Sequence, residues 1–403
     1  MGVLWEAEVL TGAAEEKRDA LGRSLLLFST ASAEDMLSKG NVWYVRHYEV
    51  FFDKVIIAFM FGNRHKEVTQ GRTTLVSLGN GKGYWVQLLT LPYRAYLFAR
   101  SVKPTDVLTA DILFYWWVFI LIRFMLKAKV WLMPVYSLEE IYRNGVRSMT
   151  GLPRWAERLA SDMSFATADG VLAATSCGSF AESLASHPIA SKKLIITQTI
   201  ADVLPSVGFF NALEKCLSDG EMMLKKPRKT RLITVGRLHR EKMLEDLIRV
   251  VAFLKEKTAP HKGVILTLVG EGPERGFLEK LAKELGVLDS VIFTGAVPNE
   301  ELPKYLFEAD VYLSPMTGTS LREAALCGLP IVAYDIDWVH GFLKHDENAL
   351  LVPRGDYKEM ARQVSRLEED GDLRARLSRN IRDLALHLWT PNALKESLRQ
   401  VFG

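Results

Sequence analysis

The sequence predicts an α/β protein made of two doubly wound domains that face a common cleft. Its 403 residues exceed the size at which a single hydrophobic core usually stops growing. Short apolar runs alternate with helical patterns, which is typical of parallel sheets covered by helices on both faces. A polar segment at 217–230 interrupts this alternation, which then begins again, so we expect a linker there.

The first half of the chain contains seven apolar runs that are short enough to be buried strands. They lie at 24–28, 54–59, 73–77, 107–109, 129–133, 170–173 and 193–197. Helical patterns between them are clearest at 84–102 and 154–167. We therefore expect an N-terminal domain at 1–215.

The second half repeats the pattern. Strands are predicted at 231–235, 264–269, 290–293, 310–313 and 330–334, and helices near 241–257, 274–285, 299–308, 320–327 and 356–369. This predicts a C-terminal domain at 230–385. Pro391 favours the start of a final helix, 391–402, within a terminal segment 386–403 that we expect to pack back on the N-terminal domain.

The composition excludes several classes of protein. A hydrophobic content of 48% and a charged content of 25% describe an ordinary folded protein, and a net charge of +3 is too small to indicate nucleic-acid binding. Cys177, Cys216 and Cys327 show no metal spacing and are expected to be free thiols in a reducing compartment. The eight histidines form no ligand pattern, so we expect neither a protein-held metal nor a cofactor.

The expected location is the cytoplasm. Residues 1–23 lack the apolar core of a secretory signal, and the apolar run 112–122 is too short to span a bilayer. That run is interpreted first as a buried helix. The alternative is a helix on the inner face of a membrane, since Arg123, Lys127 and Lys129 follow it and residues 1–205 carry the whole net positive charge.

The most informative segment is 314–335, which is predicted to be a strand end, a tight loop, a short helix and another strand. Gly318 permits a bend, and Thr319 and Ser320 are good N-cap residues, so the amides that follow form an anion site. Glu323 just inside the helix suits a diol, because a carboxylate accepts two hydrogen bonds. The segment therefore suits a nucleotide sugar. The structural alternative is a capping box formed by Ser320 and Glu323.

Three further strand ends carry residues of the same kind. Gly236 and Arg237 follow the strand at 231–235, and Lys242 comes five residues after the arginine, so both cations can reach one diphosphate. Turns with glycine follow two other strands and allow a base or ribose to approach the backbone. They comprise Gly270, Glu271, Gly272 and Pro273, and Gly295 to Val297.

Taken in order over 231–375, these four segments resemble the donor domain of retaining glycosyltransferases with the GT-B fold, in family four and its relatives (glycosyl transferases group 1). The resemblance implies that Arg237 and Lys242 hold the donor diphosphate and that Glu323 holds the ribose. The amides of Thr319, Ser320 and Leu321 would cap the distal phosphate. The two glycine turns would border the base, and no metal would be needed.

The sequence departs from the family's pattern at several positions. The first of two acidic residues eight apart would fall at Pro315, with Ser314 or Thr317 as neutral substitutes, and Met243 replaces a glycine after the lysine. A family histidine in the first half has no counterpart. Asp111 is the acidic residue best placed there to face the cleft, although it also suits a helix N-cap. Gly40 and Asn41 resemble the family's glycine-rich loop, but also suit a plain turn.

The resemblance implies a hexosyltransferase that moves a sugar from a nucleoside diphosphate sugar, UDP-linked by default, to an unknown glycan, lipid-linked or small-molecule acceptor. It also implies retention of anomeric configuration without a protein nucleophile. Two alternatives remain open: a non-catalytic nucleotide-sugar binding protein, suggested by Pro315, and a non-hydrolysing nucleotide-sugar epimerase of the same fold.

Overall fold

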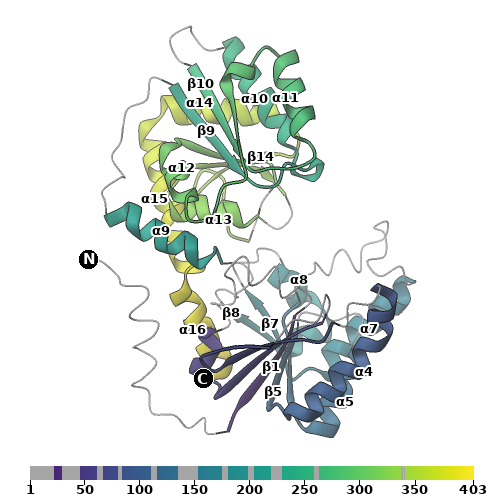
Figure 1. The fold of residues 1–403 in the computed structure, drawn as a ribbon. Coiled ribbons are helices and arrows are strands. Elements are labelled where there is room, and N and C mark those ends of the chain that lie inside the picture. Colours follow the sequence, from purple (N-terminus) through teal and green to yellow (C-terminus); the bar gives the residue numbers. More distant parts are fainter. Residues whose placement is uncertain are drawn as a thin grey trace. The chain divides into compact units, whose positions relative to one another are not determined.

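A computed structural model describes thirteen stretches of the chain. They are residues 22–29, 46–60, 67–79, 84–109, 116–134, 153–174, 180–197, 204–218, 229–257, 263–316, 318–336, 339 and 341–403. The chain forms two compact units (Figure 1). One is Val3–Ala201 together with Leu394–Gly403, and the other contains Asp202–Ala393. We call them the N-terminal and C-terminal units.

The N-terminal unit contains a mostly parallel sheet of eight strands in the order β3-β4-β2-β1-β5-β6-β7-β8. The strands are β1 (Ser24–Ser29), β2 (Lys54–Phe59), β3 (Val68–Gln70), β4 (Thr73–Ser77), β5 (Asp106–Thr109), β6 (Lys129–Leu132), β7 (Gly170–Ala174) and β8 (Leu194–Thr197). All seven predicted strands are confirmed. The sequence pattern missed β3, an exposed antiparallel edge strand of three residues that buries no apolar side chain.

Helices pack on this sheet through the apolar side chains that face it. They are η1 (Arg46–Val50), α4 (Tyr84–Val102), α5 (Trp116–Leu126), α7 (Arg154–Thr167), α8 (Phe180–Ser186) and η3 (Ala190–Lys193). Helices α4, α5 and α7 lie together on one face of the sheet (Figure 1). The apolar run 112–122 thus contributes to α5, whose Val118, Phe119 and Ile122 are buried in the core of this unit.

The C-terminal unit contains a sheet of six parallel strands in the order β11-β10-β9-β12-β13-β14. The strands are β9 (Lys229–Val235), β10 (Gly263–Val269), β11 (Val291–Gly295), β12 (Val311–Ser314), β13 (Ile331–Asp335) and β14 (Leu350–Pro353). The five predicted strands are confirmed. The sixth, β14, was not predicted; it is a short edge strand that ends in a proline, as edge strands tolerate.

The helices of the C-terminal unit include the five that the sequence predicts and two longer ones that it did not, at 207–218 and 371–388. In chain order the helices are α9 (Val207–Ser218), η5 (Arg240–Lys242), α10 (Leu244–Lys257), α11 (Arg275–Glu284), η6 (Leu288–Ser290), α12 (Leu302–Glu308), α13 (Thr319–Leu326), α14 (Tyr357–Glu369) and α15 (Gly371–Leu388). The predicted N-terminal domain, 1–215, extends into α9, whereas α9 packs against α12 and lies in the C-terminal unit. Residues 219–228 of the predicted linker lie outside the described residues.

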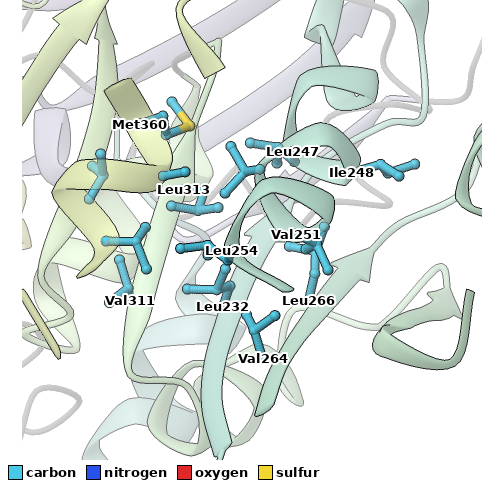
Figure 2. Packing of buried hydrophobic residues seen from close by; sticks show 14 of the residues in the cluster. Leu232, Leu247, Ile248, Val251, Leu254, Val264, Leu266, Val311, Leu313 and Met360 are labelled. Carbon is cyan, nitrogen blue, oxygen red and sulfur yellow. The ribbon is translucent and has the colours of Figure 1, made fainter. Parts of the chain in front are cut away.

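Apolar side chains from the strands and helices of the C-terminal unit pack together in a core between the sheet and its helices (Figure 2). Their spacing along the chain matches the period of each element. Val311 and Leu313 are two residues apart on β12, so their side chains point to one face of the sheet, where Leu232 also lies. Leu247 and Val251 are spaced four apart on α10 and so meet that face together. Cys216 and Cys327 are buried thiols of this unit, and burial raises the pKa of the Cys327 thiol. Cys177 lies outside the described residues.

The final helix, α16 (Pro391–Phe402), has the predicted bounds, and its C-terminal part belongs to the N-terminal unit. The ring of Phe402 lies 5.9 Å from Tyr48, 5.2 Å from Phe52 and 5.3 Å from Trp131, measured between centroids. Arg23 donates a hydrogen bond to the Phe402 carbonyl at 2.9 Å. The last residues of the chain therefore complete the core formed by the first strands.

Candidate functional site

The strand order of the C-terminal unit defines where a ligand is expected. The chain runs outward from β9 to β10 and β11, then crosses to the other side of β9 and continues with β12, which pairs with β9. Ligands of open parallel sheets bind at the carboxyl ends of the strands, at the point where the strand order reverses. That point lies between β9 and β12, and the predicted donor residues follow these two strands and their neighbours.

Backbone hydrogen bonds hold the loops after β9, β10 and β11 together. The Gly236 amide donates to Val269 at 2.9 Å, and the Leu238 amide donates to Glu271 at 3.0 Å. The Gly270 amide in turn donates to Gly295 at 2.9 Å. The structure thus brings the first three predicted segments to one end of the sheet.

Two glycines are required by the close approach of these loops. A Cβ atom on Gly270 would lie 1.9 Å from the Gly236 carbonyl oxygen, and one on Gly272 would lie 2.4 Å from the Leu238 carbonyl oxygen. Gly270 also has a φ of +141°, which side chains disfavour. These glycines therefore serve the contact between neighbouring loops, whatever ligand borders them.

The two predicted cations lie on the loop after β9. The Arg237 side chain is 72% exposed, and its nearest acidic partner is Glu241 at 3.6 Å, a weak surface pair that a ligand phosphate can displace. Lys242 is half-buried at the end of η5, and the ion pairs of the described residues include none that uses it. Both side chains are available to an anion at this loop.

Met243 occupies the position where the family's pattern has a glycine, and its backbone explains the preference. The residue caps η5 in the left-handed conformation, with a φ of 49°. A non-glycine residue there is strained. The Met243 side chain packs against the buried core, which offsets part of that strain.

Helix α13 begins one residue earlier than predicted. Its N-cap is Gly318, which has extended backbone, so Thr319 and Ser320 are the first two helical residues. The prediction that they cap the helix was wrong. The Leu321 amide donates to the Gly318 carbonyl at 3.2 Å, which leaves the amides of Thr319 and Ser320 as the donors without an intrahelical partner.

The Ser320 hydroxyl does not cap the helix because it is bonded to Tyr312. The two hydroxyls lie 2.9 Å apart, and the Tyr312 hydroxyl also bonds to the Thr234 side chain and the Val235 backbone. Burial raises the pKa of Tyr312 to about 12, so its hydroxyl stays protonated. This contact, which sequence reasoning missed, ties the start of α13 to the end of β9. The available signal was alternation along β12, which places Tyr312 on the face opposite to Val311 and Leu313.

The Glu323 carboxyl is the most unusual ionisable group of the site. It is only 6% exposed, and the hydrogen bonds of the described residues include none with its side chain. Burial raises its pKa to about 7, although the neighbouring Arg322 opposes the shift. The capping-box interpretation is wrong, because Gly318 is the N-cap and Glu323 lies beyond the first turn. Because no side chain or backbone group in the described part of the chain bonds to it, this carboxyl is available to a ligand.

Ser314 is a second buried polar group at this place. It is 2% exposed at the end of β12, and its Oγ has no hydrogen-bond partner among the residues that the structure describes. The adjacent Pro315, at the position of the family's first acidic residue, is also buried. The site therefore offers a hydroxyl where a carboxylate is usual.

The remaining predicted residues border these groups or lie outside the described part of the chain. Glu271 pairs with Arg275 at 2.7 Å, which together with the Gly272 amide lowers its carboxyl pKa. Pro273 is exposed and Val297 is half-buried. Asp111, Gly40, Asn41 and Thr317 lie outside the described residues. Across the described residues, no group of three or more His, Cys, Asp or Glu side chains is arranged to hold a metal ion.

Comparison with known proteins agrees with this geometry. Residues 222–384 match the family profile described as glycosyl transferases group 1. The matched segment belongs to that family. A curated relative, 2-deoxystreptamine glucosyltransferase of Streptomyces kanamyceticus, is 33% identical over 140 residues, which are 34% of this chain and 35% of that protein. The chain thus spans about a third of the length of that relative.

Solved structures resemble the chain over nearly its whole length. Sucrose-phosphate synthase from Thermosynechococcus elongatus aligns with a TM-score of 0.68 at 17% identity and covers 94% of this chain and 98% of its own. Anabaena HepE in complex with UDP gives a TM-score of 0.66 at 16% identity, with the same coverage. At such low identity the likeness shows the fold, which is GT-B, with two parallel-sheet domains. The group 1 segment is the C-terminal of these domains.

Proposed function

We propose that the protein is a glycosyltransferase that uses a nucleoside diphosphate sugar as donor and binds it at the β9–β12 end of the C-terminal sheet. The observation that carries the proposal is Glu323, a buried carboxyl with no side-chain hydrogen bond beside the amide end of α13. Its oxygens suit two neighbouring hydroxyls of a ribose. The curated relative described above is named a glucosyltransferase, which supports the reaction class.

The diphosphate would be held by the groups that the structure leaves available. Arg237 and Lys242 supply two cations on one loop, and the amides of Thr319 and Ser320 supply donors at a helix N-terminus. These groups neutralise the charge that grows on the leaving diphosphate, so they stabilise the transition state and need no metal for that purpose. Metal independence is therefore part of the proposal.

The expected chemistry is substitution at the anomeric carbon with retention. The bond from that carbon to the diphosphate oxygen breaks, and a bond to the acceptor hydroxyl forms on the same face. The acceptor proton passes to the departing diphosphate oxygen. The protein then acts through positioning and electrostatic stabilisation.

The donor base is proposed to be uracil, because the HepE structure contains UDP. Ser314 would replace the missing acidic residue as a neutral partner of the sugar, since its buried hydroxyl has no other partner. The acceptor, whether glycan, lipid-linked or a small molecule, would be received by the N-terminal unit.

The test is calorimetry with UDP on Arg237→Ala and Lys242→Ala. A charge-assisted hydrogen bond contributes roughly 1.5–3 kcal/mol, so each change is expected to weaken binding about ten- to a hundredfold. Arg240→Ala is the matched control, because Arg240 is an exposed arginine of the same loop that we give no role. Glu241→Gln should leave binding unchanged or tighter, since it removes the carboxylate that competes for Arg237.

Equal losses in Arg240→Ala and Arg237→Ala would contradict a specific phosphate contact. Donor turnover separates the three candidate activities. Release of free UDP together with a glycosylated acceptor supports transfer, and a changed sugar still attached to UDP supports epimerisation. Binding with neither change would leave a nucleotide-sugar binding protein.

A further inference from the structure

Exposed large apolar side chains are concentrated on three helices of the N-terminal unit. Seven residues form this set, which we call the aromatic face: Tyr93, Leu97, Trp117, Phe124, Met125, Trp155 and Leu159. Phe124 is 71% exposed and Trp155 is 69% exposed. Single exposed apolar residues are ordinary, but a cluster rich in tryptophan, tyrosine and phenylalanine indicates an interaction surface.

The three helices lie next to one another. Helix α5 packs against both α4 and α7 (Figure 1). The Tyr96 hydroxyl of α4 also reaches the Met125 sulfur of α5 at 3.2 Å. On α4 and α7 the exposed pairs are four residues apart, so each pair forms a stripe along its helix. The opposite side of α5 is buried in the core of the unit. Trp117 and Phe124 lie outside that core, so packing in the core does not explain why these positions are apolar.

The charged side chains of α4 and α5 are all cations, whereas α7 also presents Asp162, whose side chain is 41% exposed. Helices α4 and α5 contain no Asp or Glu. Arg100, Lys103 and Lys127 are exposed at the ends of these two helices. On α7, Glu157 is buried and Asp162 pairs with His187 at 3.2 Å.

Both of these lysines occupy backbone positions that usually favour glycine. Lys103 and Lys127 follow α4 and α5 in the left-handed conformation, with φ values of 53° and 57°. A cation at each position suits the helix C-terminus and also places positive charge at the rim of the aromatic face. Arg123, in contrast, is not one of these rim cations, because it pairs with Asp169 at 2.8 Å and donates to the Thr167 carbonyl.

We propose that the aromatic face binds the surface of a bilayer that contains anionic lipid. Tryptophan and tyrosine favour the interfacial region, phenylalanine and leucine enter the acyl boundary, and lysines at the rim meet the headgroups. A second copy of this chain fits less well, because a symmetric contact would bring together two faces on which α4 and α5 offer cations and no carboxylate. No helix among the described residues combines the length and apolarity needed to cross a bilayer, so the contact is a peripheral one.

Vesicle flotation of the full chain tests this proposal. With phosphatidylcholine vesicles that contain phosphatidylglycerol, the protein is expected to float at low salt and to detach as salt rises. Phosphatidylcholine alone should retain much less protein. Each lysine near an anionic surface contributes about 1 kcal/mol, so Lys103→Asn with Lys127→Asn should lower partitioning roughly thirtyfold. Asparagine is chosen because it tolerates the left-handed conformation.

Matched variants distinguish binding through the aromatic face from nonspecific binding through other exposed apolar or charged residues. Phe124→Ser should lower partitioning roughly tenfold, as expected for one aromatic ring that leaves an apolar environment. Phe277→Ser, at a phenylalanine of α11 that is 51% exposed, should change it little. Lys304→Gln with Lys358→Gln removes the same charge from the C-terminal unit and should also have little effect. Melting curves confirm that each variant is folded.

The proposal is overturned if the protein stays with the soluble fraction at low salt, or if both phenylalanine variants lose flotation equally. A dimer in sedimentation that Phe124→Ser abolishes, without any vesicle binding, would assign the face to a second copy instead. The inference stands apart from the proposed function: UDP affinity of Phe124→Ser should equal that of the wild type, and either result can fail alone.

Discussion

At the scale of single residues, the site depends on polar groups that the fold buries without satisfying. Glu323 and Ser314 both lie at the end of the sheet where the strand order reverses. The Ser314 Oγ is buried without a hydrogen-bond partner among the described residues, and the Glu323 carboxyl is 6% exposed, with a pKa that burial raises to about 7. Such groups destabilise a folded protein unless a ligand or water completes them. Tyr312 differs, because its hydroxyl is fully used to hold α13 against β9.

The raised pKa of Glu323 predicts how donor affinity depends on pH. A ribose contact needs the ionised carboxylate, but burial raises the pKa to about 7. The proton must therefore leave on binding below pH 7, and affinity for UDP-glucose is expected to fall about tenfold from pH 8 to pH 6. Glu323→Gln should bind weakly and lose this dependence. Calorimetry at several pH values is the measurement, and a wild-type affinity that does not change with pH would contradict the ribose contact.

The same shift predicts the stability of the Glu323→Gln variant. A carboxyl whose pKa is raised by folding contributes stability below its unfolded pKa and loses it as pH rises through about 7. At pH 8 the wild type therefore buries a charge that glutamine avoids. The variant should be more stable there by up to roughly 3 kcal/mol, with the advantage vanishing near pH 4. Urea unfolding at both pH values measures this, and an advantage that is equal at the two values would refute it.

At the scale of elements, the strand-end loops are held by backbone contacts that only glycine allows. Gly272→Ala would place a Cβ 2.4 Å from the Leu238 carbonyl oxygen, so it should destabilise the C-terminal unit by about 1–3 kcal/mol. Gly276→Ala, four residues further on in α11, meets no atom within 4 Å and should stabilise the helix by about 0.5–1 kcal/mol. Unfolding curves for the two variants are the measurement. If both variants lose stability equally, the close contact of Gly272 with Leu238 is not the cause of the loss.

At the scale of the whole molecule, the chain returns to its first domain at the end. Phe402 is 3% exposed among the rings of Tyr48, Phe52 and Trp131. Phe402→Ala should therefore destabilise the N-terminal unit by about 3–5 kcal/mol. UDP should raise the melting temperature of the C-terminal unit, because a ligand stabilises the state that binds it.

Scanning calorimetry with and without UDP separates these effects. The transition that Phe402→Ala lowers is expected to be the one that UDP does not raise. If the variant lowers the UDP-sensitive transition by the same amount, the two units unfold as one and the assignment of Phe402 to the N-terminal unit has no thermodynamic meaning.

The sequence by itself determined most elements of this protein and indicated the class of ligand that we propose for it. Apolar runs such as 54–59 and 264–269 predict strands, because a strand that is buried on both faces is apolar throughout. The family's pattern singled out Arg237, Lys242 and Glu323 because cations and a helix-borne carboxylate suit a nucleotide sugar. These inferences need only local chemistry. The exposed strand β3 and the short edge strand β14 escaped them, because little burial marks either one in the sequence.

Only the tertiary structure decided what each polar or apolar group is left to do. The sequence fits Ser320 and Glu323 equally well as a capping box or as ligand-binding residues. In the structure the Ser320 hydroxyl bonds to Tyr312, eight residues earlier, and Gly318 is the N-cap of α13. Arg123 and Phe124 are neighbours in one apolar run, yet one pairs with Asp169 and the other points to solvent. A sequence gives each residue its chemistry, but whether that chemistry is already satisfied depends on partners brought from distant parts of the chain.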